Sequence, residues 1–350
     1  MMQVASSRGR QTPRDQVAWR FEAAVAATGA VETDFVVAGR RVRIRFAGAG
    51  MRERLEGALA HLKAHSPGEP DLRVGVWDSR SSGIEPPPTL GAPLEGDGTG
   101  PILYYEENGV RALSRWNTLS VVDFETSEGW FWAPEPAAML SWDWASPMRA
   151  IFHWWLGRHG VLQVHGGAVG DESLGVLVVG RGGSGKSTTC LAALTGGLRY
   201  AGDDFVAIEN GFPPRVHSLY SSGKLETHQI LRFPALRTGV VNERREAEEK
   251  AIVYAAQSHP QAPVSSFELA AVLVPRVRAD RPESTLVPAS AAAALAALAP
   301  STIFQLHPPQ TDALRTMARL VATAPCYRLE LGSDLDLIPD AIRRALEATR

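Results

Sequence analysis

The sequence predicts an α/β protein in which an N-terminal α+β domain precedes a domain of alternating strands and helices. From about residue 146 onward, apolar strand patterns alternate with helical patterns, which is typical of a parallel or mixed sheet with helices packed on it. The tryptophans also separate two regions, because all 9 lie between Trp19 and Trp155. A chain of 350 residues is long enough for two domains. We therefore predict domains at residues 1–145 and 146–350.

The composition excludes several classes of protein. The 36 basic and 38 acidic residues nearly balance, so nothing favours nucleic acid or an anionic membrane as a partner. Two cysteines are too few for a disulfide framework. The start of the chain lacks the apolar segment of a secretory signal, and no apolar stretch approaches the about 20 residues that cross a bilayer. We expect a soluble, cytoplasmic protein, for which an oligomer is compatible with the sequence.

The first elements are short and mixed. Residues 41–46 alternate basic with apolar side chains, which predicts a half-buried strand as the second arm of a hairpin. Apolar residues from Met51 to Leu62 recur at helical spacing, which predicts an amphipathic helix. Residues 72–76 again alternate like a strand. Residues 79–100 are rich in Pro, Gly and Ser, so we expect a flexible loop there.

Turn and cap residues mark the elements that follow. Asn108-Gly109 is a strong turn pair between two strand patterns. Ser146-Pro147 predicts the N-cap and first position of a helix that ends near Gly157. The later predicted elements are strands at residues 161–164, 175–179, 269–274 and 327–331, and helices after Pro288, at residues 311–323 and after Pro339.

A glycine-rich segment carries the clearest chemical signal. Gly180-Arg181-Gly182-Gly183-Ser184-Gly185-Lys186-Ser187 fits the pattern G-x-x-x-x-G-K-[ST] at every fixed position, after an apolar strand and before a helix. Glycines let successive backbone N–H groups converge, and the helix N-terminus adds partial positive charge. We therefore predict a phosphate-binding loop (P-loop) for a nucleoside triphosphate. The residues expected to contact the nucleotide are Gly180, Gly182, Gly183, Ser184, Gly185, Lys186, Ser187 and Thr188.

Two adjacent carboxylates follow the predicted loop and helix. Asp203 and Asp204 stand at the start of an apolar strand, where adjacent side chains point in opposite directions. One carboxylate could then serve a metal ion and the other an acceptor hydroxyl, as in a kinase. We expect Lys186 to bridge the β- and γ-phosphates and the Ser187 hydroxyl to ligate Mg²⁺. The base-reading motif of Ras-type GTPases and the signature of transport ATPases are both missing from the sequence.

Three ordered motifs resemble the catalytic core of the HPr kinase/phosphorylase family. They are His165-Gly166-Gly167-Ala168, the glycine-rich loop, and Arg199-Tyr200-Ala201-Gly202-Asp203-Asp204, within residues 161–209. The resemblance implies a P-loop nucleotide-binding core akin to that of phosphoenolpyruvate (PEP) carboxykinase, and Mg²⁺-dependent transfer of phosphate from ATP to a serine hydroxyl. It implies that Asp203 is the acid/base, that Asp204 is its partner at the metal and the lysine, and that His165 lies beside the catalytic acid.

The sequence also departs from that family. Thr188 stands where the family usually has glutamate, the family's second signature is not recognisable, and the N-terminal region differs. We therefore do not expect phosphorylase activity, or the phosphocarrier HPr as substrate.

The sequence accordingly predicts a Mg²⁺-dependent kinase that transfers the γ-phosphate of ATP to a hydroxyl, above all a serine of a peptide or protein. Its catalytic residues would be His165, Lys186, Asp203 and Asp204, and its metal ligands Ser187 and Asp204. Lys224 and Arg232 are candidates for contacting the acceptor or the transferred phosphate. Two alternatives stay open: a kinase for a small hydroxylated molecule, and an ATP-binding switch or assembly module without catalysis.

Overall fold

The computed structural model describes residues 12–94, 102–115, 117–246 and 248–350. The chain forms two compact units. The first comprises Met1–Thr33, Val42–Arg54 and Pro70–Met139, and the second comprises Asp34–Arg41, Leu55–Glu69 and Leu140–Arg350. Two short early segments thus cluster with the second unit, and the simple division at residues 145 and 146 stays a prediction.

The first unit is built on a mixed sheet in the order β1-β2-β3-β8-β7-β6-β5-β4. Strand β2 is parallel to β3, and β3 is parallel to β8. Strands β4, β5, β6, β7 and β8 pair in that order, and each of these pairs is antiparallel. The strands are β1 (Ala30–Val37), β2 (Arg40–Ala47), β3 (Leu72–Asp78), β4 (Ala92–Leu94), β5 (Ile102–Glu107), β6 (Val110–Arg115), β7 (Thr118–Asp123) and β8 (Glu128–Ala133).

Several local predictions in this part of the chain are confirmed. The expected strand at residues 41–46 lies within β2, and its apolar side chains are buried. The expected amphipathic helix is α2 (Gly50–Leu59) with a 3₁₀ turn at Ala60–Leu62. Asn108 and Gly109 have φ angles of 51° and 75° between β5 and β6, as a tight hairpin turn requires.

Two features of this part differ from the prediction. Helix α1 (Pro13–Thr28) was not predicted, although Thr12 and Asp15 form a capping box with Pro13 at its start. The expected loop at residues 79–100 was wrong in part, because it contains helix α3 (Ser79–Ser82) and strand β4. Asp78 caps α3 through its side chain, which stabilises a turn that composition alone does not reveal. Residues 95–100 of that range lie outside the described residues.

The second unit contains a larger mixed sheet in the order β12-β10-β11-β17-β14-β13-β9, with β19 on β17 and β18 on β19. Strands β11, β17 and β19 are parallel, and the other neighbours are antiparallel. Its strands are β9 (Val161–His165), β10 (Gly167–Gly170), β11 (Leu174–Val178), β12 (Arg199–Gly202), β13 (Phe205–Glu209), β14 (Arg215–Ser218), β17 (Ser266–Val277), β18 (Thr285–Pro288) and β19 (Cys326–Leu331). A separate pair is formed by β15 (Ser222–Leu225) and β16 (Ala251–Tyr254).

The helices of the second unit are α4 (Ser141–Trp144), α5 (Arg149–Arg158), α6 (Lys186–Thr195), α7 (Ala255–Ser258), α8 (Ala291–Gln305), α9 (Ala313–Thr323) and α10 (Ile338–Glu347), with 3₁₀ turns at Ile230–Arg232, Pro234–Gly239 and Leu335–Leu337. The predicted start of α5 at Pro147 was wrong. Met148 has a left-handed φ of 54° and serves as the N-cap, so the helix begins at Arg149.

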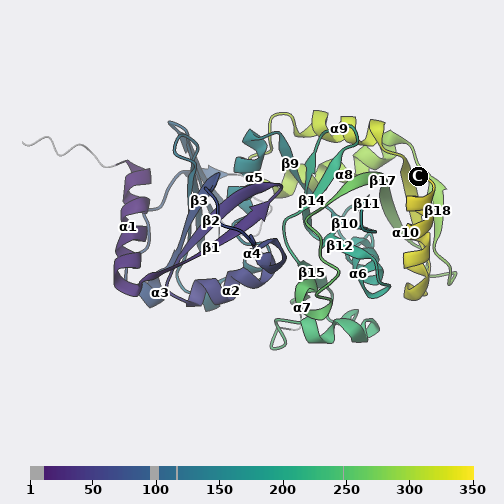
Figure 1. Cartoon of the computed structure of the whole chain (residues 1–350), viewed down its shortest axis with the longest axis horizontal. Coiled ribbons are helices and arrows are strands. Elements are labelled where there is room, and N and C mark those ends of the chain that lie inside the picture. The colour runs from purple at the N-terminus through teal and green to yellow at the C-terminus, as the bar shows by residue number, and fades with distance from the viewer. Residues whose placement is uncertain (1–11, 95–101, 116, 247) are drawn as a thin grey trace, which may run out of the picture. The chain divides into compact units, whose positions relative to one another are not determined.

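The side chains of β11 show how the second sheet is covered. Val176 and Val178 belong to a core cluster with residues of α6 and α10, whereas Leu177 belongs to a second cluster with residues of α8 and α9. Alternate residues of one strand thus pack on opposite helical layers. Figure 1 shows α8 and α9 on one side of this sheet and α6 and α10 on the other. The predicted α/β class, a mixed sheet with helices packed on it, is confirmed for this unit.

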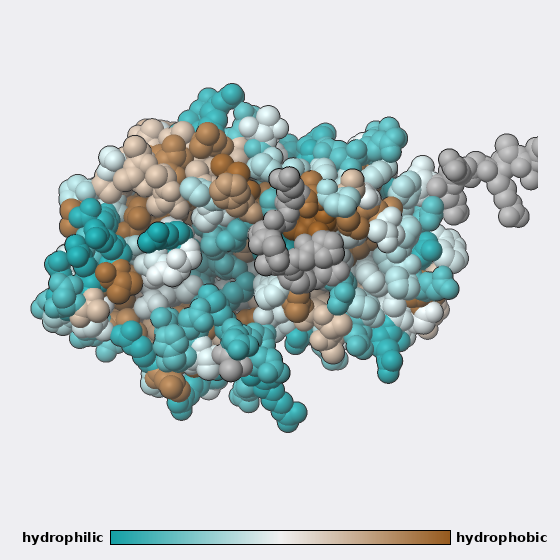
Figure 2. All heavy atoms as spheres, turned by 180° about the vertical axis from the view of Figure 1, so that it is seen from behind, coloured by the Kyte–Doolittle hydropathy of each residue, from teal (hydrophilic) through white to brown (hydrophobic). Residues whose placement is uncertain are grey.

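The surface is mixed in character. Figure 2 shows hydrophilic residues over much of one face of the molecule, with apolar patches between them. Isolated exposed apolar side chains, such as Phe212 and Phe304, are ordinary for a folded chain. In the parts of the chain that the structure describes, no helix combines the length and the apolar character needed to span a membrane.

Candidate functional site

The glycine-rich segment forms the turn between β11 and α6, so the predicted order of strand, loop and helix is present. Two of its glycines are required by the backbone. Gly183 and Gly185 have φ angles of 75° and 102°, which side chains rarely tolerate. A Cβ atom at Gly185 would also lie 2.5 Å from Leu331 Cδ1. The loop can therefore curl tightly into the N-terminus of α6 only with glycine at these positions.

Lys186 is the first residue of α6 and folds back over the loop. Its Nζ donates hydrogen bonds to the carbonyl oxygens of Gly180 at 2.8 Å and Arg181 at 3.3 Å. The side chain is buried, and burial lowers the pKa of Lys186, while the nearby carboxylates of Asp203 and Asp204 oppose that shift. The ammonium group is thus held inside the loop, where it can meet an anion.

Asp203 follows β12 and is only 1% exposed. The backbone N–H of Lys224 donates to its Oδ2 at 2.9 Å, and the Ser187 hydroxyl also hydrogen-bonds to this carboxylate. Its Oδ1 is buried and has no hydrogen-bond partner among the described residues. Burial raises the pKa of Asp203 from 3.8 to about 6, against the lowering effect of the Lys224 N–H. This carboxylate is therefore poised to exchange a proton near neutral pH.

Asp204 has a different environment from its neighbour. Its Oδ1 lies 3.2 Å from His165 Nε2, at the end of β9, and its Oδ2 accepts a hydrogen bond from Lys224 Nζ at 2.6 Å. Burial alone would raise the pKa of Asp204, but the Lys224 ammonium and His165 hold it well below its usual range. Asp204 is therefore a fixed anion. Two carboxylates with pKa values pushed apart are a common arrangement in acid/base sites.

Asp203 and Asp204 lie in a bend between β12 and β13, directly before the predicted strand. The expectation that one carboxylate serves a metal ion and the other an acceptor hydroxyl stays a prediction. Both line one cavity, and Lys224 contacts both, one through its backbone and the other through its side chain. The resemblance implied that His165 lies beside the catalytic acid, and the histidine contacts Asp204, the neighbour of Asp203.

The carboxylate cavity has a volume of about 410 Å³. It brings together most of the residues singled out in the sequence. Its lining consists of Trp142, His165, Gly182, Gly183, Gly185, Lys186, Ser187, Thr188, Asp203, Asp204, Lys224, Glu226, Gln229, Lys250, Val277 and Gln305.

Some predicted residues lie elsewhere, and some lining residues were not predicted. Gly180 and Ser184 line a neighbouring cavity instead. Arg232 is not among the lining residues, and its guanidinium donates to the Ser333 carbonyl at 2.8 Å. Gln229 was missed, although its side chain oxygen lies 3.4 Å from the Thr188 hydroxyl. Lys250 also lines the cavity, so three of the four lysines of the sequence border it.

The cavity offers oxygen ligands for a hard cation. Within the described ranges, no group of three or more His, Cys, Asp and Glu side chains is placed to hold a metal ion. Mg²⁺ requires few protein ligands, because phosphate oxygens and water complete its coordination. The Ser187 hydroxyl and the unpaired Asp203 Oδ1 fit such an ion, whereas both oxygens of Asp204 are already paired. The predicted ligand pair of Ser187 and Asp204 would require Asp204 to exchange one of its partners.

Comparisons with known proteins add little to this geometry. No family model matches the chain, and no curated protein matches it. Among solved structures 97 chains match, one of them described as the structure of the Hpr(Ser) kinase/phosphatase from Coxiella burnetii. That match has 13% sequence identity and a TM-score of 0.28, and covers 52% of this chain and 94% of that chain. A likeness this weak carries no argument about function, which rests here on the residues of the site.

The two carboxylates predict opposite effects on stability. Because the folded-state pKa of Asp203 is raised from 3.8 to about 6, its contribution to stability is lost as pH rises through that window. At pH values above this window, the buried negative charge lowers the free energy of unfolding by about 3 kcal/mol. We expect Asp203→Asn to raise the free energy of unfolding at pH 7.5 by up to that amount, a gain that disappears toward pH 4.

The matched variant is Asp204→Asn. It removes the anion that Lys224 and His165 contact, so it should lower the free energy of unfolding at pH 7.5. Urea unfolding at several pH values measures the free energy of unfolding of both variants. A change of the same sign in the two variants would contradict the assignment of charges.

Proposed function

We propose that this protein is an ATP-dependent kinase that transfers the γ-phosphate to a hydroxyl, with a serine of a peptide or protein as the acceptor. One observation carries the proposal. A buried carboxylate with a pKa of about 6 and one unpaired oxygen, Asp203, lies in the same cavity as the lysine of a glycine-rich loop. An anion-binding loop needs no such group to bind a nucleotide, whereas phosphate transfer to a hydroxyl does.

The loop and helix α6 supply the binding of the phosphates. Backbone N–H groups at the start of a helix attract anions, and Lys186 adds a full positive charge next to them. In phosphate transfer, charge spreads over the γ-phosphate oxygens, and groups already in place stabilise it. Bound Mg²⁺ would neutralise part of that charge, held by Ser187 and by Asp204 once Asp204 exchanges one of its present partners, so that Asp203 Oδ1 stays free for the proton.

We assign to Asp203 the role of the base that takes up the proton of the acceptor hydroxyl. As the acceptor oxygen forms its bond to the γ-phosphorus, the bond from that phosphorus to the bridging oxygen of ADP breaks, and the acceptor hydroxyl proton passes to Asp203. The Lys224 N–H fixes Oδ2, so the carboxylate keeps its orientation while Oδ1 stays available. The Asp204 anion holds the Lys224 ammonium and His165, which positions the segment that carries this N–H.

The border of the carboxylate cavity bears on the nature of the acceptor. Trp142, Glu226, Lys250 and Gln305 border the carboxylate cavity and combine apolar surface with both signs of charge. Such a rim suits a peptide segment around a serine. A small hydroxylated molecule is the alternative acceptor, and an ATP-binding switch without transfer is the alternative function. We further propose that the N-terminal unit serves acceptor recognition or regulation, in the cytoplasm.

A direct assay tests this function. The purified chain is incubated with Mg²⁺, ATP and a library of serine-containing peptides, and mass spectrometry detects a gain of about 80 Da. We expect Lys186→Ala to weaken ATP binding at least about 10-fold, because it removes the cation inside the loop. Asp203→Ala should leave ATP affinity nearly unchanged but slow transfer by about 10²- to 10⁴-fold.

The control for these variants is Asp280→Ala, an exposed carboxylate outside the cavity, which should behave as the wild type. Transfer that persists in Asp203→Ala would refute the role of this residue. ATP binding without phosphorylation of any peptide or small-molecule acceptor would favour the switch.

The pKa of Asp203 also predicts the pH dependence of transfer. A base must be ionised to take the hydroxyl proton, so kcat/KM for the acceptor should rise with pH through about 6 and then level off. Steady-state rates from pH 5 to 8 at saturating ATP measure this profile. A profile that is flat across pH 6, or that falls as pH rises through it, would show that another group handles the proton.

A further inference from the structure

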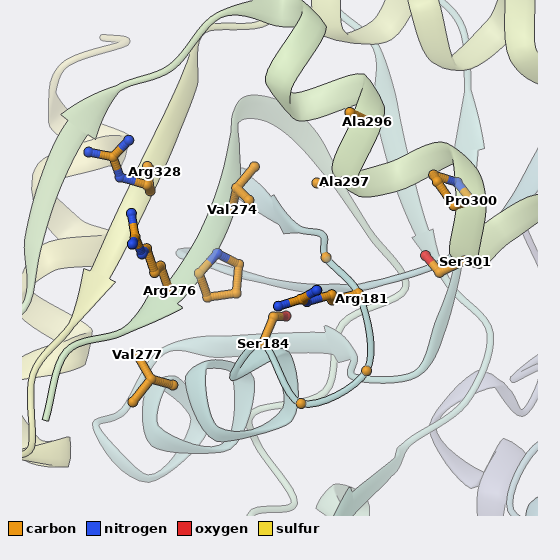
Figure 3. Close-up of a pocket in the computed structure, with 14 residues that line it drawn as sticks. Arg181, Ser184, Val274, Arg276, Val277, Ala296, Ala297, Pro300, Ser301 and Arg328 are labelled. Atoms are coloured by element: carbon orange, nitrogen blue, oxygen red, sulfur yellow. The ribbon is translucent and has the colours of Figure 1, made fainter.

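A second cavity lies against the same glycine-rich loop and has no assigned role. Its volume is about 890 Å³, within the range of sites that bind small molecules. It is lined by residues 180–184 of the loop, residues 274–277 at the end of β17, Arg328 of β19, and Ala296, Ala297, Pro300 and Ser301 of α8 (Figure 3). The described residues that line it include no carboxylate, so this cavity cannot itself supply the acid/base group.

The linings of the two cavities differ although both border the loop. The second cavity is lined by the ends of β17 and β19, whereas Asp203 and Asp204 lie in the bend between β12 and β13 and line the first. The two cavities share only Gly182, Gly183 and Val277. A triphosphate on the loop with its terminal phosphate at Asp203 would leave its other end towards the second cavity.

The side chains of the second cavity suit a flat, uncharged ring attached to an anion. In the described part of the chain, the guanidinium groups of Arg181 and Arg276 have no hydrogen-bond or ion-pair partner, while Arg328 is paired with Glu330. Figure 3 shows Arg276 and Arg328 along one wall, Arg181 reaching from the loop towards them, and the small residues of α8 opposite. A guanidinium plane stacks well on an aromatic ring.

We propose that this second cavity binds the nucleoside of the triphosphate, with its base against the guanidinium groups of Arg181 and Arg276 and the apolar surface of Pro275 and α8. The inference rests on the proposed function, because it takes the terminal phosphate to lie at Asp203. An acceptor molecule does not belong in this cavity, since its hydroxyl must reach Asp203, which lines the other cavity.

Calorimetric titrations with Mg²⁺·ATP and with Mg²⁺·tripolyphosphate test the proposal. Tripolyphosphate carries the same chain of phosphates without the nucleoside. We expect the wild type to bind ATP at least about 10-fold more tightly than tripolyphosphate, because stacking of one base contributes that much affinity. Ala297→Trp fills the cavity and should remove this difference, because it weakens the binding of ATP but not that of tripolyphosphate. Ala292→Trp, exposed on the same helix and outside the cavity lining, is the matched control.

A second variant, Arg276→Ala, removes an exposed side chain and leaves the core intact. It should also lower the affinity for ATP at least a few-fold, while the affinity for tripolyphosphate stays within about two-fold of the wild type. Unchanged ATP affinity in both Ala297→Trp and Arg276→Ala, or an equal loss for the two ligands, would overturn the proposal. So would a wild type that binds the two ligands equally well. A wild type that binds neither ligand would instead refute the proposed function itself.

Discussion

Two carboxylates and two ammonium groups meet in one largely dehydrated region of the second unit, and the local structure follows from the need to pair them. An unpaired charge away from water is costly, so each must have partners supplied by the chain. Lys186 is held by loop carbonyls, Asp204 by Lys224 and His165, and Asp203 by the Lys224 N–H. Among the described residues, Asp203 Oδ1 is a carboxylate oxygen without a partner, and the chemistry that we propose depends on it.

Lys224 links the two halves of this arrangement. Its backbone belongs to β15, which pairs with β16 outside the large sheet, so a separate two-stranded sheet supplies contacts to both carboxylates. The loop, the bend after β12 and this small sheet come from three segments of the chain. Their convergence explains how one carboxylate stays ionised while its neighbour takes up a proton near neutral pH. Helices on both faces of the sheet support β11 and so fix the loop that follows it.

Local sequence signals predicted much of this architecture. The loop from Gly180 to Ser187 was recognisable because its fixed residues are required by backbone geometry, and the later strands and helices followed from the period of their apolar residues. The start of α5 was missed because it depends on a left-handed Met148, which no propensity predicts. The fine structure of the site was also out of reach. Lys224 lies 20 residues beyond Asp204, and only the folded chain shows that it contacts both acids.

The second cavity illustrates the same limit of sequence patterns. Its walls come from the loop, from β17 and β19, and from α8, segments that are close only because β11 and β17 are parallel neighbours. Arg276 and Arg328 carry no recognisable motif. They line a different cavity from the carboxylates, and only the folded chain shows this. In our proposal, a bound nucleotide runs from this second cavity along the loop towards Asp203.

The central claim is that the loop holds a triphosphate with its terminal phosphorus at Asp203. A crystal structure of the chain with Mg²⁺ and a non-hydrolysable ATP analogue tests it most directly. We expect the γ-phosphate beside Lys186, with room for one acceptor oxygen about 3 Å from both the phosphorus and an oxygen of Asp203. An analogue bound with its γ-phosphate in the second cavity, or with Asp203 turned away from it, would show that Asp203 does not act on this phosphate.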